Sequence, residues 1–437
     1  MHGLLLSVFQ TLEQENIQYC LMRDADQLDE FAKGGELDLL VQGSQLAQLQ
    51  KLLTRLAFVA LPSWGYGAHH FFIAYHQETD YWFKLDVVTE IAYGQPISTL
   101  QTKLALRCLS GRRRFGPTFV LSPECELVTL LLHCLLDKKN FAPLRSQRLQ
   151  ALSRQTLDQP MLDALLREYW SSTMTGPQLV ALLDAGNWNA LLGERKKVAE
   201  RLAKRDRLGT ISRAVGGRLL RKINVWTTAR RPQSLTVALL APDGAGKSTL
   251  VEGLQDGFYF PVQAIYMGLY QKGKQGRLRL NFPGSGFVFR LLTLWSRYLG
   301  ARYHQSRRRL VIFDRYIYDS LLPTRQRLSW PKRCRRWLLA HACPDPDLVI
   351  MLDVPGELLY ARKGEHTAEI LEQQRQHYLK LKPYLPQMVV INATQDADTV
   401  RREAIALIWR GYVRRQAGLS ASQTISATNA HVQATTV

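Results

Sequence analysis

The sequence predicts an α/β protein in two parts: an α+β domain in the N-terminal half, and a parallel sheet with helices on both faces in the C-terminal half. Three observations support this prediction. The chain has 437 residues, too many for one ordinary core. Helix and strand patterns mix in the first part of the chain. Beyond residue 234, fully apolar runs alternate with longer helical stretches, which is typical of buried parallel strands.

The first domain is expected over residues 1–120. An amphipathic opening helix precedes the run Leu37–Val41, which has the composition of a strand. Two further strands are expected over 70–75 and 81–88, joined by a polar turn. From 121 to 192 the apolar residues recur at helical spacing, so a helical extension should follow the first domain.

Residues 193–233 form a basic segment that we interpret as a helical connector. A solvated basic face is favoured there over a dedicated lipid or nucleic-acid site. The whole chain carries a formal charge of +20, which attracts nucleotides, anionic membranes and nucleic acid without choosing among them. A peripheral contact with an anionic membrane fits this charge. Nucleic-acid binding is disfavoured, because no recognised nucleic-acid-binding module accompanies the charge.

The second domain is expected over residues 234–414. Its strands should be the apolar runs 235–240, 264–267, 310–313, 348–352 and 388–391. Residues 415–437 are rich in Ser, Ala, Thr and Gln, which predicts a disordered tail. The six cysteines have no short paired spacing, and neither a signal peptide nor a membrane span is evident. These features favour a reducing, cytoplasmic compartment.

A phosphate-binding loop follows the first strand of the second domain. Residues 241–249 read APDGAGKST, and a helical pattern begins directly after them. The glycines let backbone N–H groups turn toward a phosphate, and the positive end of the following helix points at the same place. Lys247 would reach the β- and γ-phosphates of a nucleotide, and the Ser248 hydroxyl would hold Mg²⁺. Ala241 stands where the usual pattern begins with glycine.

An acidic and a basic residue, Asp314 and Arg315, stand together at the end of the buried run 310–313. The carboxyl ends of strands line the ligand crevice of an open parallel sheet. Asp314 could therefore hold the metal or the acceptor, and Arg315 could neutralise charge on a moving phosphoryl group.

A third element follows the strand that ends at Asp353. A helix there ends in Arg362 and Lys363, and Arg375 comes further along. Such arginines could belong to a mobile lid that excludes water from a bound nucleotide. A plain solvated helix is the alternative interpretation.

The order of these motifs resembles thymidylate kinase, a P-loop nucleoside monophosphate kinase, over about residues 235–412. The resemblance implies a kinase that uses ATP and Mg²⁺ and phosphorylates a small phosphorylated acceptor such as dTMP. It implies that Asp243 faces the acceptor, that Asp314 and Arg315 are the family's acidic–basic pair, and that Arg362 and Arg375 belong to the lid. The ATP phosphate loop would comprise Gly244, Ala245, Gly246, Lys247, Ser248 and Thr249.

The sequence departs from this family where the acceptor should bind. Thymidylate kinases carry an Arg-Glu-Pro segment after the second strand, and residues 265–274 contain no such triplet. Lys272 or Lys274 could replace its arginine, and Arg297 is a candidate for the family's arginine near the base. A sugar, polyol or lipid-linked phosphate used in surface polysaccharide assembly is therefore an alternative acceptor. A non-catalytic ATP-binding regulatory module and a homodimer are further alternatives.

The N-terminal domain resembles the minimal nucleotidyltransferase fold. Glu36 and Asp38 lie one residue apart on an expected strand and so point to the same face. Asp86 on a later strand would complete a metal site. Glycines directly abut the carboxylate pair, whereas the family has a Gly-Ser turn shortly before it, so a domain that binds or positions a ligand is favoured over a working transferase. His133 lies on an apolar helical pattern, which favours a packed side chain over a functional one.

Overall fold

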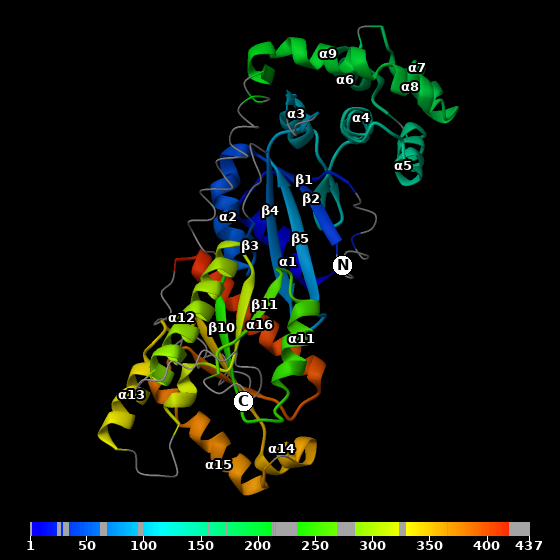
Figure 1. Ribbon diagram of the computed structural model, residues 1–437. Helices are drawn as coiled ribbons and strands as arrows, with labels where there is room; N and C mark the ends of the chain where they lie inside the picture. The colour runs from blue at the N-terminus through cyan, green and yellow to red at the C-terminus, as the bar shows by residue number, and fades with distance from the viewer. Residues whose placement is uncertain are drawn as a thin grey trace. The chain divides into compact units, whose positions relative to one another are not determined.

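The computed structural model describes residues 2–23, 28, 35–61, 68–94, 99–155, 157–171, 173–211, 213, 215, 234–268, 285–322, 329–364 and 366–418. These residues divide into two compact units, and the boundary between them falls between 215 and 234 (Figure 1). Among the described residues, no helix has both the length and the apolar composition needed to cross a bilayer.

The N-terminal unit is built on a mixed sheet, in which the described strands follow the order β3-β4-β5-β2-β1-β9-β8. The strands expected over 37–41, 70–75 and 81–88 are confirmed as β2, β4 and β5. The strands of this sheet are β1 (Tyr19–Leu21), β2 (Gly35–Val41), β3 (Val59–Ala60), β4 (His69–His76), β5 (Tyr81–Val88), β8 (Arg113–Phe115) and β9 (Thr118–Val120). A separate ribbon joins β6 (Ala92–Tyr93) to β7 (Leu100–Gln101).

Helices cover both faces of this sheet. Alternate residues of β2 point to opposite faces and therefore pack in two different cores. Leu39 and Val41 pack with α1 (Gly3–Gln14) and α2 (Leu46–Arg55). Leu40 packs in a second core formed with the helical region that follows the sheet. The helices of that region are α3 (Leu104–Ser110), α4 (Pro123–Leu132), α5 (Pro143–Ser153), α6 (Gln159–Tyr169), α7 (Gly176–Asp184) and α8 (Trp188–Gly193).

The basic segment 193–233 is helical in its first part, α9 (Arg195–Arg205). Val198 and Leu202, four residues apart, are buried in the second core of the N-terminal unit. That spacing places both side chains on one face of the helix. Helix α9 therefore packs as part of the N-terminal unit, and residues 216–233 of the expected connector lie outside the described residues.

The C-terminal unit contains a five-stranded parallel sheet, in which the described strands follow the order β11-β12-β10-β13-β14. All five expected strands are confirmed, and their ends differ from the expected ones by two residues at most. They are β10 (Thr236–Leu240), β11 (Val262–Tyr266), β12 (Leu310–Asp314), β13 (Leu348–Asp353) and β14 (Met388–Asn392).

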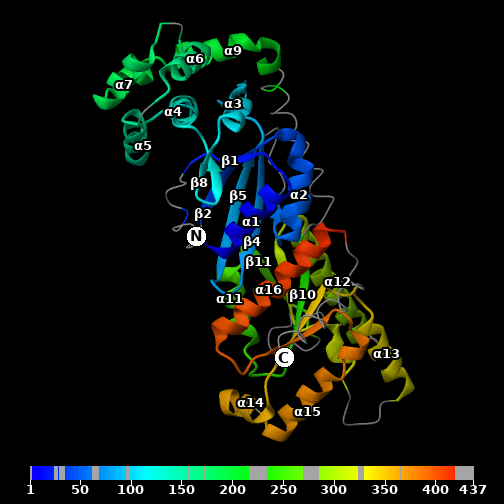
Figure 2. The same cartoon turned by 180° about the vertical axis from the view of Figure 1, so that it is seen from behind.

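Both faces of this sheet are buried, as the continuous apolar runs predict. Ala238 and Leu240 share a core with Leu294 of α12 (Ser285–Ser306), and Val237 and Leu239 are buried on the other side of β10. Helix α11 (Lys247–Gly257) packs against α16 (Ala397–Gln416). Figures 1 and 2 show α12 and α16 on opposite sides of the sheet.

The remaining helices of this unit are α13 (Trp330–Ala340), α14 (Gly356–Lys363) and α15 (Ala368–Leu379). Since the strands are parallel, their carboxyl ends meet at one edge of the sheet. In such a sheet the ligand crevice lies outside this edge, where the connections from a central strand diverge. Strand β10 is central, and the loop 241–246 follows it. Helix α16 extends to Gln416, and residues 419–437 of the expected tail lie outside the described residues.

Candidate functional site

The loop 241–246 turns directly from β10 into α11. Gly244 and Gly246 adopt φ angles of 89° and 90°, which L side chains rarely adopt. A Cβ atom at Gly244 would lie 3.1 Å from the carbonyl oxygen of Leu359, whereas one at Gly246 would meet open space. Ala245 is buried between the glycines, and Ser248 and Thr249 are exposed in the first turn of α11. The backbone thus has the form that the motif requires for a phosphate.

The Lys247 side chain lies over this loop. Its Nζ donates hydrogen bonds of 2.8 Å to the carbonyl oxygens of Ala241 and Pro242. The side chain is 11% exposed, and its Nζ lies 3.8 Å from Asp243 Oδ1. Burial, together with the nearby Arg315 guanidinium, lowers the pKa of Lys247 to about 8. The surroundings of the amine therefore disfavour its protonated form. A bound anionic ligand would stabilise that form and raise the pKa of Lys247 again.

The pair Asp314–Arg315 lies beside the loop, because Leu239 of β10 is paired with Asp314 of β12. Arg315 Nη2 donates to Asp243 Oδ1 at 2.5 Å, and Nη1 lies 3.7 Å from Asp319. Burial alone would raise the pKa of Asp243, but Arg315 and Lys247 hold it below its usual value. Cations and carboxylates thus alternate around the loop.

Arg315 also has an unusual backbone. Its φ angle is +62°, in the left-handed region, which costs a residue other than glycine about 1 kcal/mol. Its amide N–H nevertheless donates to the carbonyl oxygen of Leu239 at 3.2 Å. Strain of this kind concentrates at functional sites, and here it accompanies the ion pair between the Arg315 side chain and Asp243.

Asp314 is distinguished by an unpaired oxygen. Its Oδ1 atom is buried and has no hydrogen-bond partner in the structure. A buried carboxylate oxygen without a partner is costly, and a cation would satisfy it. This oxygen fits the metal site that the sequence predicts for Asp314.

Helices α14 and α15 follow β13 and contain the two arginines expected in a lid. Helix α14 ends at Lys363, and the residue that follows it, Gly364, has a φ angle of +64°. Arg362 Nη1 and Nη2 donate long hydrogen bonds, of 3.4 and 3.3 Å, to the carbonyl oxygen of Ala393. Arg375 forms a bidentate pair with Asp353 at 2.5 and 3.0 Å and also contacts Glu372. The structure therefore places Arg375 in an ion-pair network, whereas the partner of Arg362 among the described residues is the backbone carbonyl of Ala393.

Two contacts of this site are not evident from the sequence motifs. Asp319 lies four residues after Arg315, and its carboxylate accepts a hydrogen bond of 2.9 Å from the Tyr378 hydroxyl. Burial raises the pKa of Asp319, although Arg315 acts against this. Only the i, i+4 spacing of Arg315 and Asp319 could have indicated their pairing.

The expected acceptor side is described only in part. Arg297 of α12 donates to the carbonyl oxygen of Gly268 at 3.3 Å, and its guanidinium lies 5.5 Å from the Tyr266 ring centroid. Tyr266 ends β11 and is followed by the segment expected to bind the acceptor. Lys272 and Lys274 lie outside the described residues.

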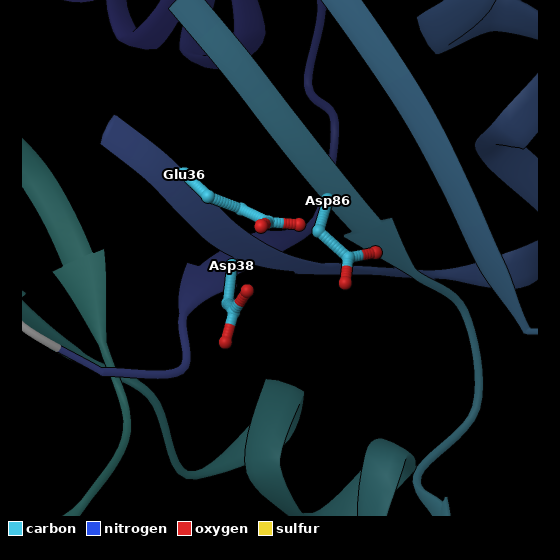
Figure 3. Close-up of side chains that lie close together, drawn as sticks. All are labelled: Glu36, Asp38 and Asp86. Atoms are coloured by element: carbon cyan, nitrogen blue, oxygen red, sulfur yellow. The ribbon is translucent and has the colours of Figure 1, made fainter. Parts of the chain in front are cut away.

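The N-terminal unit brings Glu36, Asp38 and Asp86 together (Figure 3). Glu36 and Asp38 are on β2, and the Cα of Asp38 is the register partner of the Cα of Asp86 on the parallel strand β5. One oxygen from each carboxylate lies within 4.8 Å of the others. Such a group of hard oxygen donors suits Mg²⁺, Mn²⁺ or Ca²⁺.

Each of these carboxylates also has a cationic or histidine neighbour. Lys84 Nζ lies 2.8 Å from Glu36, Arg23 Nε lies 3.6 Å from Asp38, and His69 Nδ1 lies 2.9 Å from Asp86. Burial, with contributions from the other two carboxylates, raises the pKa of Asp38 to about 6 despite the opposing Arg23. The three neighbours were not predicted from the sequence. Lys84 had a recognisable signal, since it stands two residues before Asp86 on the same strand.

His133 lies in a π-helical segment, His133–Lys138, that continues from α4. Its Nδ1 atom is 3.0 Å from Asp137 Oδ2, and Asp137 Oδ1 accepts a hydrogen bond of 2.8 Å from the Gly94 amide. Burial lowers the pKa of His133, although the hydrogen bond to Asp137 acts against this. His133 is therefore a hydrogen-bonded, half-buried side chain.

No protein-family model matches the chain. The chain is 35% identical over 111 residues to the probable thymidylate kinase of Thermococcus kodakarensis, covering 23% of this chain and 52% of the relative. It is 30% identical over 118 residues to the probable thymidylate kinase of Thermococcus onnurineus, covering 24% of this chain and 55% of the relative.

Two solved structures resemble part of the chain. One is the thymidylate kinase of Candida albicans, at 16% identity and a TM-score of 0.33, covering 41% of this chain and 93% of that one. The other is the deoxyadenosine kinase of M. mycoides with bound dATP, at 14% identity and a TM-score of 0.28, covering 39% and 98%. The chain spans about half the length of the curated relatives that it matches in sequence.

Proposed function

We propose that this chain is an ATP-dependent phosphotransferase that moves the γ-phosphoryl group of ATP to a nucleoside monophosphate such as dTMP. The observation that carries the proposal is that Lys247 Nζ and Arg315 Nη2 both approach Asp243 Oδ1, at 3.8 and 2.5 Å, where the loop after β10 meets the carboxyl end of β12. The partial similarity to probable thymidylate kinases supports the same chemistry. Six unpaired cysteines are compatible with a cytoplasmic location.

Two side chains are suited to holding Mg²⁺. Ser248 is exposed in the first turn of α11, and Asp314 offers a buried oxygen without a hydrogen-bond partner. Hydroxyl and carboxylate oxygens are hard donors, which Mg²⁺ prefers. When bound, the metal would neutralise charge on the nucleotide phosphates.

The cationic side chains would act on the transferred group. Lys247 would exchange its two backbone carbonyl partners for oxygens of the β- and γ-phosphates. Arg315, held in place by Asp243, would neutralise charge as the phosphoryl group moves. Arg362 would approach the nucleotide from the lid, and to do so it would break its two long hydrogen bonds to the carbonyl oxygen of Ala393. Arg375 would act mainly by fixing α15 to the end of β13.

Asp243 is the side chain proposed to face the acceptor. Its lowered pKa keeps it ionised, so it would accept a hydrogen bond from an acceptor hydroxyl group. Since residues 265–274 lack the Arg-Glu-Pro triplet, a sugar, polyol or lipid-linked phosphate is the second candidate acceptor. An ATP-binding module without catalysis comes last, because binding alone would not require the strained Arg315 beside Asp314.

ADP release in a coupled assay tests the proposal. The purified protein would be given Mg-ATP and a panel of dTMP, dUMP, UMP, CMP, AMP, GMP, and sugar and polyol phosphates. Lys247→Ala serves as the blank, and Lys382→Ala, which removes an exposed lysine of the same unit, as the matched control. We expect acceptor-dependent ADP release that Lys247→Ala abolishes. A folded Lys247→Ala protein with unchanged turnover would refute the assignment of the site.

For the N-terminal unit we propose a divalent metal site formed by Glu36, Asp38 and Asp86. The convergence of three carboxylates from two parallel strands supports it. The resemblance to nucleotidyltransferases makes transfer of a nucleotidyl group the candidate activity, and binding without transfer the simpler alternative. In both cases the cations Lys84 and Arg23 would have to release their carboxylates, at least in part.

Electron paramagnetic resonance of Mn²⁺, recorded without nucleotide, tests this site directly. We expect wild-type protein to retain Mn²⁺ and Asp38→Asn to release it, because one of three ligands is lost. Glu90→Gln, an exposed carboxylate two residues beyond the end of β5, is the matched control and should bind like wild type. Equal Mn²⁺ binding by wild type and Asp38→Asn would exclude the site.

A further inference from the structure

The Arg315 guanidinium lies between two carboxylates. Its Nη2 atom donates to Asp243 Oδ1 at 2.5 Å, and its Nη1 atom lies 3.7 Å from Asp319 Oδ2. The first contact is a short hydrogen bond between charged groups, whereas the second is an ion pair that is too long for a hydrogen bond. The Arg315 side chain is 29% exposed, so part of it remains accessible to a ligand.

The two carboxylates differ in how firmly they are held. Asp243 lies in the phosphate loop, its side chain is 34% exposed, and it contacts Arg315 and Lys247. Asp319 is 13% exposed, and its second oxygen, Oδ1, accepts a hydrogen bond of 2.9 Å from the buried hydroxyl-bearing side chain of Tyr378. Asp319 is therefore the more firmly fixed of the two partners of Arg315.

The burial of Asp319 has a cost. A carboxylate that leaves water loses favourable hydration, and an ion pair at 3.7 Å recovers only part of it. Burial accordingly raises the pKa of Asp319, although Arg315 acts against this. Ionisable groups in such surroundings concentrate at functional sites, and this one lies beside the arginine that we propose acts on the transferred group.

Binding of the acceptor would make the second carboxylate necessary. Asp243 is the side chain proposed to accept a hydrogen bond from the acceptor, and this new bond would weaken its contact with Arg315. Asp319 would remain in place, because the Tyr378 hydroxyl holds it. A small rotation of the Arg315 side chain would then shorten its distance to Asp319 to about 2.8 Å, as in an ordinary charge-assisted hydrogen bond.

The anchor of Asp319 is itself tied to the sheet. Tyr378 lies on α15, three residues after Arg375, and Arg375 pairs with Asp353 at the end of β13. The contacts therefore run without a break from the sheet, through α15 and Asp319, to Arg315.

We propose that Asp319 is a positioning residue for Arg315. It keeps the guanidinium directed at the transferred phosphoryl group while Asp243 contacts the acceptor, and Tyr378 holds Asp319 in place for this. The proposal rests on the role proposed above for Arg315 in phosphoryl transfer, and it adds a residue that lies outside the phosphate-loop and Asp314–Arg315 motifs.

Asp319→Asn separates the two contacts of Asp319. Asparagine has the same shape and keeps an oxygen for the Tyr378 hydroxyl, but it lacks the charge that attracts Arg315. In the coupled assay of ADP release we expect kcat to fall roughly 10-fold to 100-fold, because misplacing a catalytic group by about 1 Å has an effect of this order. The KM for Mg-ATP should change little, since Lys247 and the loop remain intact.

Two further variants accompany it. Tyr378→Phe leaves the charge of Asp319 and removes its anchor, so kcat should fall in the same direction but by less. Asp345→Asn is the matched control, because Asp345 also accepts a hydrogen bond from a tyrosine, Tyr318, at 2.7 Å. Its kcat and KM should equal those of the wild type.

A double-mutant cycle with Arg315→Gln shows whether Asp319 acts through the arginine. In the Arg315→Gln background, Asp319→Asn should cause no further loss of kcat, since no guanidinium remains to be positioned. Transfer of label from γ-labelled ATP makes slow turnover measurable in both proteins. An equal loss in both backgrounds would mean that Asp319 acts independently of Arg315, which would overturn the proposal.

Chemical labelling of arginine tests the same contact without using turnover. Phenylglyoxal modifies accessible guanidinium groups, and mass spectrometry of peptides from the full-length protein gives the rate at Arg315. Asp319→Asn should raise this rate, because the side chain loses one of its two anchors, and Asp345→Asn should leave it unchanged. An unchanged rate in Asp319→Asn would overturn the proposal.

The two measurements distinguish failure of this proposal from failure of the proposed function. If the wild type transfers phosphoryl groups to no acceptor, the proposed function fails, and the labelling rate alone decides whether Asp319 positions Arg315. A normal kcat in folded Asp319→Asn would overturn the positioning role while leaving the kinase assignment intact. Circular dichroism and thermal unfolding check that each variant is folded, and Tyr378→Phe decides by the same measurements if Asp319→Asn is not.

Discussion

Lys247→Met should stabilise the C-terminal unit while abolishing its proposed activity. The wild-type amine is 11% exposed, and burial beside Arg315 lowers its pKa from 10.5 to about 8. Near neutral pH the amine is still protonated, so folding places a charge in an unfavourable site. Methionine has a similar length and no charge, and it fits irregular spaces well.

The magnitude follows from the shift in pKa. Each unit of pKa corresponds to 1.36 kcal/mol, so the wild type loses about 3 kcal/mol of stability at neutral pH. The two hydrogen bonds from Nζ to backbone carbonyls offset this by about 1 kcal/mol each. The free energy of unfolding of the variant should therefore exceed that of the wild type by about 1 kcal/mol near neutral pH.

The difference should reverse at high pH. Between about pH 8 and pH 10.5 the folded wild type has released the Lys247 proton, whereas the unfolded chain still binds it. Stability rises with pH wherever the unfolded state binds more protons, so the wild type gains about 3 kcal/mol across this window and the variant does not. Titrating groups that both proteins contain change their free energies of unfolding equally, so they do not affect the difference between the two proteins.

Urea unfolding of both proteins at about pH 7 and about pH 10 measures this difference. The transition of the C-terminal unit is the one that Mg-ATP shifts in the wild type, because a ligand stabilises only the unit that binds it. A stability difference that does not change with pH would refute the buried, charge-disfavouring position of Lys247.

Three further predictions concern the same unit. Asp314→Asn should lower Mg²⁺-dependent turnover by about 100-fold or more without lowering the melting temperature, because the buried Oδ1 atom accepts no hydrogen bond from the described residues. A normal rate would exclude Asp314 as a ligand. Gly244→Ala should destabilise the protein by more than Gly246→Ala. Gly246→Ala costs about 1 kcal/mol from its φ angle alone, whereas the Cβ atom at position 244 also meets a carbonyl oxygen at 3.1 Å. Equal melting temperatures of the two variants would contradict the loop geometry. A double-mutant cycle of Arg375→Met and Asp353→Asn should give a coupling of about 1 kcal/mol in urea unfolding, and additivity would show that the pair does not fix α15.

The parallel sheet and the phosphate loop were predictable because their signals are local. A continuous apolar run such as Leu310–Phe313 identifies a strand buried on both faces, and the glycines of 241–249 identify the turn after one. The contacts of Asp319 with Tyr378 and of Arg375 with Asp353 were not predictable. They join residues 59 and 22 positions apart, and only the packing of helices on the sheet brings these together.

In the N-terminal unit, too, local patterns predicted some of the contacts, whereas others depend on tertiary structure. The alternation of side chains along β2 placed Glu36 and Asp38 on one face, and the expected neighbouring strand supplied Asp86. The partners Arg23 and His69 depend on how β1, β2, β4 and β5 are ordered in the sheet, which no local pattern specifies.

Helix α9 illustrates how composition can hide packing. Its many basic residues suggested a solvated connector, whereas two apolar residues four positions apart are enough to join it to a core. A pair such as Val198 and Leu202 is too short a pattern to stand out in a basic segment.

The central claim is that the phosphate loop and the Asp314–Arg315 pair transfer the γ-phosphoryl group of ATP to a nucleoside monophosphate. The most direct measurement follows that group itself, using ATP labelled in the γ-phosphate and chromatographic separation of the products formed with dTMP and with the other acceptors. We expect the label to appear in a nucleoside diphosphate, dTDP being the leading candidate, and to be absent from this product with Lys247→Ala. ATP binding with no transfer of label to any acceptor would contradict the claim.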